Sequence, residues 1–123
     1  MIEDWTNAET HAAHLRISHS RGENMFWKEI ARGHWREAEE EAGDDLSFRS
    51  DLAMEELSLL LEQHYQEKIE RLTTDSMVRV LAIEAWKRVD WMELADHLLN
   101  SLEVGYEVCP RYHNRKQQEK TDG

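Results

Sequence analysis

The chain has 123 residues, of which 26 are acidic and 15 are basic, and its formal net charge is −11. This length suits one domain with a core of its own. The acidic excess argues against direct nucleic-acid binding, which needs Lys and Arg to neutralise phosphates. It fits instead an acidic surface that meets the basic groove of a nucleic-acid-binding protein. A simpler explanation of the same charge is a well-solvated surface that keeps the protein soluble.

The chain carries one cysteine, Cys109, so it cannot form an internal disulfide, and it suits a reducing compartment. No apolar run approaches the roughly 20 residues that a membrane-spanning helix needs. The acidic first ten residues lack the basic start of a signal peptide. We therefore predict a cytoplasmic protein without a membrane partner.

Apolar residues recur at steps of three and four, the helical period, and the chain has only five Gly and one Pro. The pattern predicts an all-α fold, a single compact domain of about five helices over residues 1–105. The first helix is expected over about 7–20, with Thr6 as N-cap, Glu9 completing a capping box and Gly22 as the C-cap. Residues 106–123 are polar and aperiodic, which predicts a flexible tail.

The second helix is expected over about 23–42, with Trp27, Ala31 and Trp35 on its buried face. The third is expected over about 45–72, where Asp51 offers a cap for a break near Ser50. The last two are expected to form a C-terminal helical hairpin over 73–104, around which the fold is organised. The residues expected on the buried face of its first helix are Val78, Leu81, Ala82, Ala85, Trp86 and Val89.

The junction inside this hairpin has a strong helix-start pattern. Asp90 is suited to cap the helix that follows, and Glu93 stands where it can reach back to the Asp90 N–H group. The helix after the junction is expected to bury Trp91, Leu94, Ala95, Leu98 and Leu102.

The chain contains no pattern that points to catalysis or a cofactor. There is no glycine-rich phosphate loop, no H-E-x-x-H and no pair of cysteines. His11 and His14 share one side of the first helix and His19 follows, which leaves a metal-binding helical protein as a minor alternative. Cys109 lies near His113 in the tail, which leaves a reactive thiol as another. We predict no catalytic residues, no metal site and no cofactor.

Acidic residues crowd the end of the second helix and the turn after it, where they oppose the helix dipole. Local stability does not favour this placement, so we predict a partner-binding surface there. Its residues are Glu37, Glu39, Glu40, Glu41, Asp44 and Asp45. Met25 and Phe26 lie off the buried stripe and are expected to form an exposed apolar spot beside it.

Two stretches resemble a family of small proteins common in bacteriophages and related mobile elements. They are Trp5-Thr6-Asn7-Ala8-Glu9-Thr10 and Ala85 through Leu99, which includes Val89-Asp90-Trp91 and Glu93-Leu94-Ala95. The likeness spans about residues 4–104, although the middle matches only in its helical pattern. Members usually have an aromatic residue where His11 stands here. The resemblance implies a phage-type accessory protein and no particular activity.

The last two helices are also similar in style to acidic helical antirestriction and anti-CRISPR proteins that mimic DNA. We therefore expect a non-catalytic protein that binds and inhibits a partner with a basic surface. The expected partner is a nucleic-acid-handling defence protein, such as a CRISPR effector or a restriction enzyme. The alternative is a structural or regulatory accessory protein without a defence role. The sequence does not indicate the oligomeric state.

Overall fold

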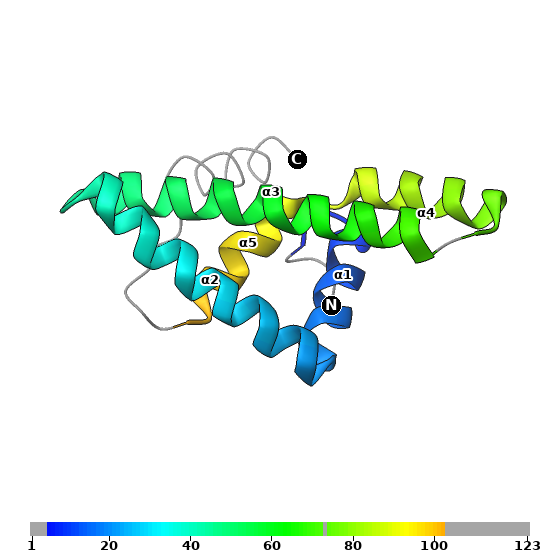
Figure 1. The fold of residues 1–123 in the computed structure, drawn as a ribbon, viewed down its shortest axis with the longest axis horizontal. Coiled ribbons are helices and arrows are strands. Elements are labelled where there is room, and N and C mark those ends of the chain that lie inside the picture. Colours follow the sequence, from blue (N-terminus) through cyan, green and yellow to red (C-terminus); the bar gives the residue numbers. More distant parts are fainter. Residues whose placement is uncertain (1–4, 73, 103–123) are drawn as a thin grey trace.

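The computed structural model of the chain describes residues 5–72 and 74–102, and these form an all-α domain of five helices (Figure 1). The bounds are α1 Ala8–His19, α2 Arg21–Ala42, α3 Leu46–Leu72, α4 Ser76–Arg88 and α5 Trp91–Asn100. The all-α prediction is confirmed. The predicted tail over 106–123 and the domain boundary at 105 lie outside the described residues.

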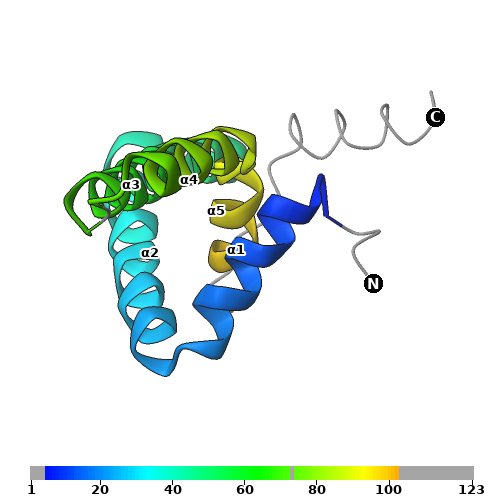
Figure 2. The same ribbon diagram turned by 90° about the vertical axis from the view of Figure 1, so that its right-hand side faces the viewer.

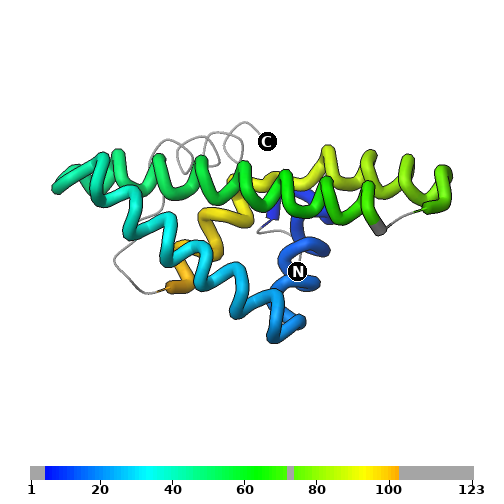
Figure 3. Tube along the Cα trace, in the orientation of Figure 1, coloured from blue at the N-terminus to red at the C-terminus, as the bar shows by residue number. Residues whose placement is uncertain are grey.

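Helix α3 runs along the whole molecule, and α4 doubles back beside its C-terminal half (Figure 1). Helices α1 and α2 converge at Ser20, away from this pair, and α5 lies between them (Figure 2). The tube view shows the same path, with α5 turning away from the direction of α4 at the Asp90 junction (Figure 3). The helix that pairs lengthwise with α4 is thus α3, while α5 turns into the core.

The core lies where α2, α3 and α5 meet, because each carries an apolar stripe at helical spacing. The buried residues of α2 are Trp27, Ala31, Trp35 and Ala38, as its pattern predicts. Those of α3 include Ala53, Met54, Leu57 and Leu61, and Leu94, Ala95, Leu98 and Leu99 are buried on α5. Trp91 is only half-buried and stacks on Tyr65, with ring centroids 5.9 Å apart.

The start of α1 is hydrogen-bonded to the junction between α4 and α5. The Asp90 N–H donates to the Thr10 hydroxyl at 2.8 Å, and the Thr6 N–H donates to the Glu93 carboxylate at 3.0 Å. The Asn7 amide donates to the Arg88 carbonyl at 2.6 Å. These bonds join positions about 80 residues apart, so they fix the start of α1 to the core.

One predicted helix cap falls on a different residue in the structure, and another is made by the predicted residue. Asn7, not Thr6, caps α1, because the Thr6 N–H is held by Glu93 while the Asn7 carboxamide accepts from the Thr10 N–H. Asp90 caps α5 as predicted, accepting from the Glu93 N–H at 3.0 Å. Glu93 does not return this bond to the Asp90 N–H, which Thr10 engages.

The ends of the middle helices also differ from the prediction. Gly22 is not a C-cap, because it lies inside α2, which begins at Arg21 directly after Ser20. No break occurs near Ser50, and α3 is continuous from Leu46 to Leu72. Ser50 is fully buried in that helix, which leaves Asp51 no helix start to cap.

The predicted buried face of α4 is the main error. No residue of this helix is buried, and Val78 and Leu81 are more than half exposed. The pattern identifies the apolar face of the helix correctly, but within residues 5–72 and 74–102 its main neighbours are α3 and α1. Trp86 is half-buried, and its indole N–H donates to the Glu62 carbonyl of α3 at 2.9 Å.

Candidate functional site

The six acidic residues predicted to bind a partner lie together at one end of the molecule, where α2 meets α3. We call them the acidic end: Glu37, Glu39, Glu40, Glu41, Asp44 and Asp45. All six are exposed. Gly43 makes the turn between the helices with φ of +60°, a conformation that glycine adopts without strain.

Two of these carboxylates have structural partners. Asp45 accepts from the Phe48 N–H at 3.0 Å and so holds the first turn of α3. Glu39 pairs with Arg49 at 3.5 Å, and Arg49 also lies over the Trp35 ring, 3.8 Å from its centroid. The structure therefore gives Asp45 a local role that the sequence analysis did not assign. The carboxylates of the acidic end repel one another. The N-terminus of α3 offsets part of this repulsion, because the helix dipole there favours acidic groups.

Three of the remaining carboxylates border a hollow between α2 and α3. Glu37, Glu40 and Glu41 line it from α2 and Glu56 lines it from α3, together with Ala38 and Leu52. Its volume is about 450 Å³. A space with a mainly polar lining and four carboxylates around it matches the cationic head of an Arg or Lys side chain.

One group beside the hollow has the composition of a metal site. His34, Glu37 and Glu56 place one ligand atom each within 4.8 Å of the others, and His34 Nδ1 lies 3.3 Å from Glu56. The two carboxylates are exposed. Among the described residues this is the group that could hold an ion, and it differs from His11, His14 and His19, the minor alternative in the sequence. The sequence did not reveal it because Glu56 is on another helix.

The structure does not place Met25 and Phe26 beside the acidic end. Both are exposed as predicted, at 58% and 48%. They lie on the first turns of α2, however, and about 14 residues at a 1.5 Å rise separate Phe26 from Glu40, roughly 20 Å. Phe26 also packs edge-on against Trp27, with centroids 5.1 Å apart. A partner would have to be large to touch both sites.

A second exposed apolar surface, absent from the prediction, lies on α4. We call it the α4 ridge: Met77, Val78, Val80 and Leu81, each between 52% and 67% exposed. Four neighbouring apolar side chains on one short helix are typical of a protein contact surface. The sequence predicts two of its residues, Val78 and Leu81, to be buried.

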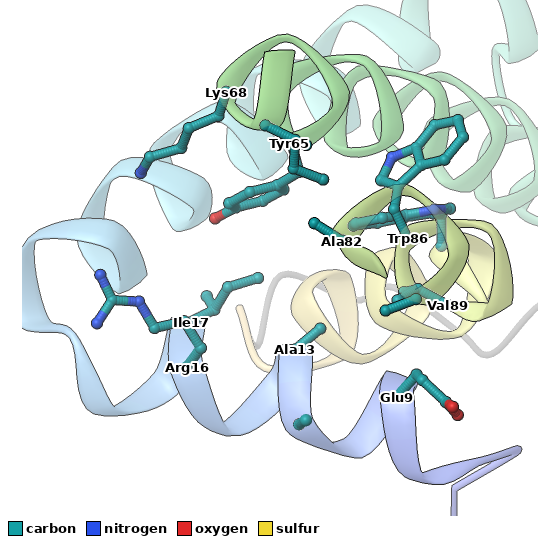
Figure 4. A pocket seen from close by; sticks show the side chains of 13 residues that line it. Glu9, Ala13, Arg16, Ile17, Tyr65, Lys68, Ala82, Trp86 and Val89 are labelled. Atoms are coloured by element: carbon teal, nitrogen blue, oxygen red, sulfur yellow. The ribbon is translucent and has the colours of Figure 1, made fainter. Parts of the chain in front are cut away.

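An apolar groove runs between α1, α3 and α4, and we call it the alanine groove (Figure 4). Its volume is about 440 Å³. Alanines line it from both sides, Ala12 and Ala13 on α1 and Ala82 and Ala85 on α4. Larger apolar side chains, including those of Ile17, Tyr65 and Trp86, complete its walls. No cluster in the sequence predicts it, because the three helices are far apart along the chain.

A hydrogen-bonded chain starts in the core and ends at the mouth of this groove. The Trp27 indole N–H donates to the Tyr65 hydroxyl at 2.9 Å, and this hydroxyl donates to Glu23 at 2.9 Å. Glu23 pairs with Arg16 at 3.1 Å. Burial, reinforced by the Glu23 carboxylate, raises the pKa of Tyr65 well above its usual range, so the phenol stays protonated.

A cluster of rings fastens the N-terminal segment to α5. Trp5 stacks on His14 with centroids 4.6 Å apart, and it lies 5.2 Å from His97. His14 and His97 meet edge to face at 4.5 Å. Burial lowers the pKa of both histidines, and their mutual repulsion lowers that of His14 further. Trp5 therefore packs against α1, through His11 and His14, as well as against α5.

Comparisons with protein-family models, with curated proteins and with solved structures give no significant match to this chain. None of the helices in the described ranges 5–72 and 74–102 has both the length and the apolar character to cross a membrane. The class that fold and surface define is an acidic all-α domain with exposed carboxylates at one end and an exposed apolar ridge on α4.

Proposed function

We propose that this protein is a non-catalytic, phage-type accessory protein that binds a protein partner with a basic surface and inhibits it. The observation that carries the proposal is the hollow at the acidic end, where Glu37, Glu40, Glu41 and Glu56 surround a space suited to a cationic side chain. A partner that handles nucleic acid has such side chains in its binding groove. Occupying them would block access to its substrate.

The partner class is a cytoplasmic host-defence protein, of the kind that CRISPR effectors and restriction enzymes represent. Two features support this choice. The net charge of −11 favours association with a basic protein over contact with nucleic acid itself. The resemblance of residues 5–10 and 85–99 to phage proteins implies a setting in which such inhibitors act.

A capture experiment tests the proposal. Tagged wild-type protein and a variant with Glu37→Gln, Glu40→Gln, Glu41→Gln and Asp44→Asn are each incubated with host lysate, and bound proteins are quantified by mass spectrometry. The variant keeps Asp45 and Glu39, whose partners are structural. We expect wild type to enrich a nucleic-acid-handling protein that the variant captures at least tenfold less.

A matched control removes the same charge elsewhere. Glu29, Glu67, Glu70 and Glu84 are exposed on other surfaces, and replacing all four with Gln leaves the acidic end intact. The control should capture the partner as wild type does, because a local contact and not net charge drives binding. Equal capture by all three proteins would contradict the proposal.

The α4 ridge favours a second candidate, an accessory protein with a structural or regulatory role and no inhibitory one. Its apolar side chains would support a contact that does not depend on salt. In that case Val80→Asp and Leu81→Asp together would abolish capture, while neutralising the acidic end would not.

A further inference from the structure

We propose that the alanine groove is a binding site for a small amphipathic anion, such as a medium-chain carboxylate. The groove lies between α1, α3 and α4, away from the acidic end (Figure 4). The inference is therefore independent of the proposed protein-binding function and goes beyond it.

The walls of the alanine groove are apolar, which indicates that the ligand has an apolar part. Facing helices carry alanines, Ala13 on α1 and Ala82 on α4, so the helices leave a space that their own side chains do not fill. At about 440 Å³ this space lies in the range of small-molecule sites. An alkyl chain would contact Ile17 and Trp86 and remove apolar surface from water, which favours binding.

The side chains at the mouth of the alanine groove indicate the charge of the ligand. Figure 4 shows Arg16 and Lys68 at one end of the groove, on either side of the Tyr65 hydroxyl. Two cationic side chains at one opening stand out on a chain with a net charge of −11. A carboxylate placed between them would gain two charge-assisted contacts.

Arg16 and Lys68 each have a contact that holds the side chain, and each can still bind an anion. Glu23 fixes Arg16 at 3.1 Å, but a guanidinium has five N–H donors, so several remain for an anion. The Lys68 amine lies 5.9 Å from the centroid of the Tyr65 ring, and no acidic group in the described residues forms an ion pair with it. The opposite end is occupied by Glu9, paired with Arg88, which disfavours a second anionic group there.

Calorimetric titration of the full chain with decanoate tests the proposal, and decyltrimethylammonium serves as the matched cation of equal chain length. We expect saturable one-to-one binding of decanoate, at least tenfold tighter than that of the cation. Lys68→Gln should weaken decanoate about tenfold, the factor that one charge-assisted contact supplies. Lys87→Gln, which removes a charge from the outer side of α4, should leave the affinity unchanged.

A groove-filling variant tests the apolar part. Ala82→Leu places a larger side chain in the groove and should weaken decanoate at least tenfold, with circular dichroism confirming its helix content. Lys68→Gln is a surface change, so its result stands even if Ala82→Leu does not fold. Absence of saturable binding would overturn the proposal, as would equal affinity for the two ligands. Binding to anionic lipid vesicles without binding to free decanoate would also overturn it, and would point to a membrane surface.

Discussion

The Thr10 hydroxyl accepts a hydrogen bond from the Asp90 N–H at 2.8 Å and donates one to the Asn7 carboxamide at 2.7 Å. Thr10 is completely buried. One side chain therefore joins the cap of α1 to the residue that caps α5, 80 positions away. Its hydroxyl satisfies a backbone N–H that the start of α5 would otherwise leave unpaired.

Replacing Thr10 with Val keeps the shape of the side chain and removes both bonds. Since it removes the Thr10 acceptor from the part-buried Asp90 N–H, we expect the free energy of unfolding to fall by about 1–3 kcal/mol. Urea denaturation followed by circular dichroism measures this loss. Thr74→Val, at an exposed position before α4, should change stability by less than about 0.5 kcal/mol. Equal stability of the two variants would show that the Thr10–Asp90 bond does not hold the start of α1 against the core.

The Trp5–His14–His97 cluster predicts a particular dependence of stability on pH. The folded pKa of both histidines is lowered from the usual 6.5, mainly by burial. Below pH 6.5 the unfolded chain binds protons that the folded chain binds less readily, so stability falls as the pH drops. Above pH 6.5 both states are neutral at these positions and the effect vanishes.

Melting temperatures between pH 7.5 and 5.5 measure this effect. We expect the wild-type value to fall with acidification, and His97→Gln to reduce that fall because Gln does not titrate. His19→Gln, at an exposed position on the last turn of α1, should change the pH dependence much less, because His19 makes the smallest contribution to the lowered pKa of His14. Glu93 and Asp96 raise the pKa of His97 and oppose the effect of burial. If the melting temperature of His97→Gln depends on pH as that of wild type does, these two carboxylates cancel the effect of burial on His97.

Neutralising the acidic end should not destabilise the fold. The variant Glu37→Gln, Glu40→Gln, Glu41→Gln and Asp44→Asn removes like charges that repel each other around the end of α2. It retains Asp45, which holds the first turn of α3, and Glu39, which pairs with Arg49. We expect an equal or higher melting temperature. A loss of several degrees would show that these carboxylates serve folding instead of binding.

The group of His34, Glu37 and Glu56 gives the metal-binding alternative a direct test. We expect micromolar Zn²⁺ to leave the melting temperature unchanged relative to EDTA, because structural zinc sites use four protein ligands and two of these three are exposed. A rise of several degrees that His34→Gln abolishes would instead establish a metal site. The variant separates this site from ion binding elsewhere on an acidic chain.

The parts of the fold that the sequence predicts well are local. The stripe of Trp27, Ala31 and Trp35 lies inside one helix, and the Asp90 cap involves residues three apart. Helical spacing and capping chemistry act over such distances, so the pattern is enough to identify them.

The parts that the sequence misses depend on distant partners. Periodicity marks the apolar face of α4 but not whether another element covers it, and Val78 and Leu81 remain exposed. Thr6 and Asn7 are both suited to cap α1, and the choice is made by Glu93, 87 positions from Thr6. The hollow, the alanine groove and the His34 group all join different helices, so none appears as a motif.

The most direct test of the central claim is the association rate with the captured partner, measured at low and at physiological salt. The account predicts that wild type associates at least tenfold faster than the variant Glu37→Gln, Glu40→Gln, Glu41→Gln and Asp44→Asn at low salt. It also predicts that salt reduces this difference, since screening weakens exposed charges. Equal association rates at both salt concentrations would contradict the claim that the acidic end recognises a basic surface.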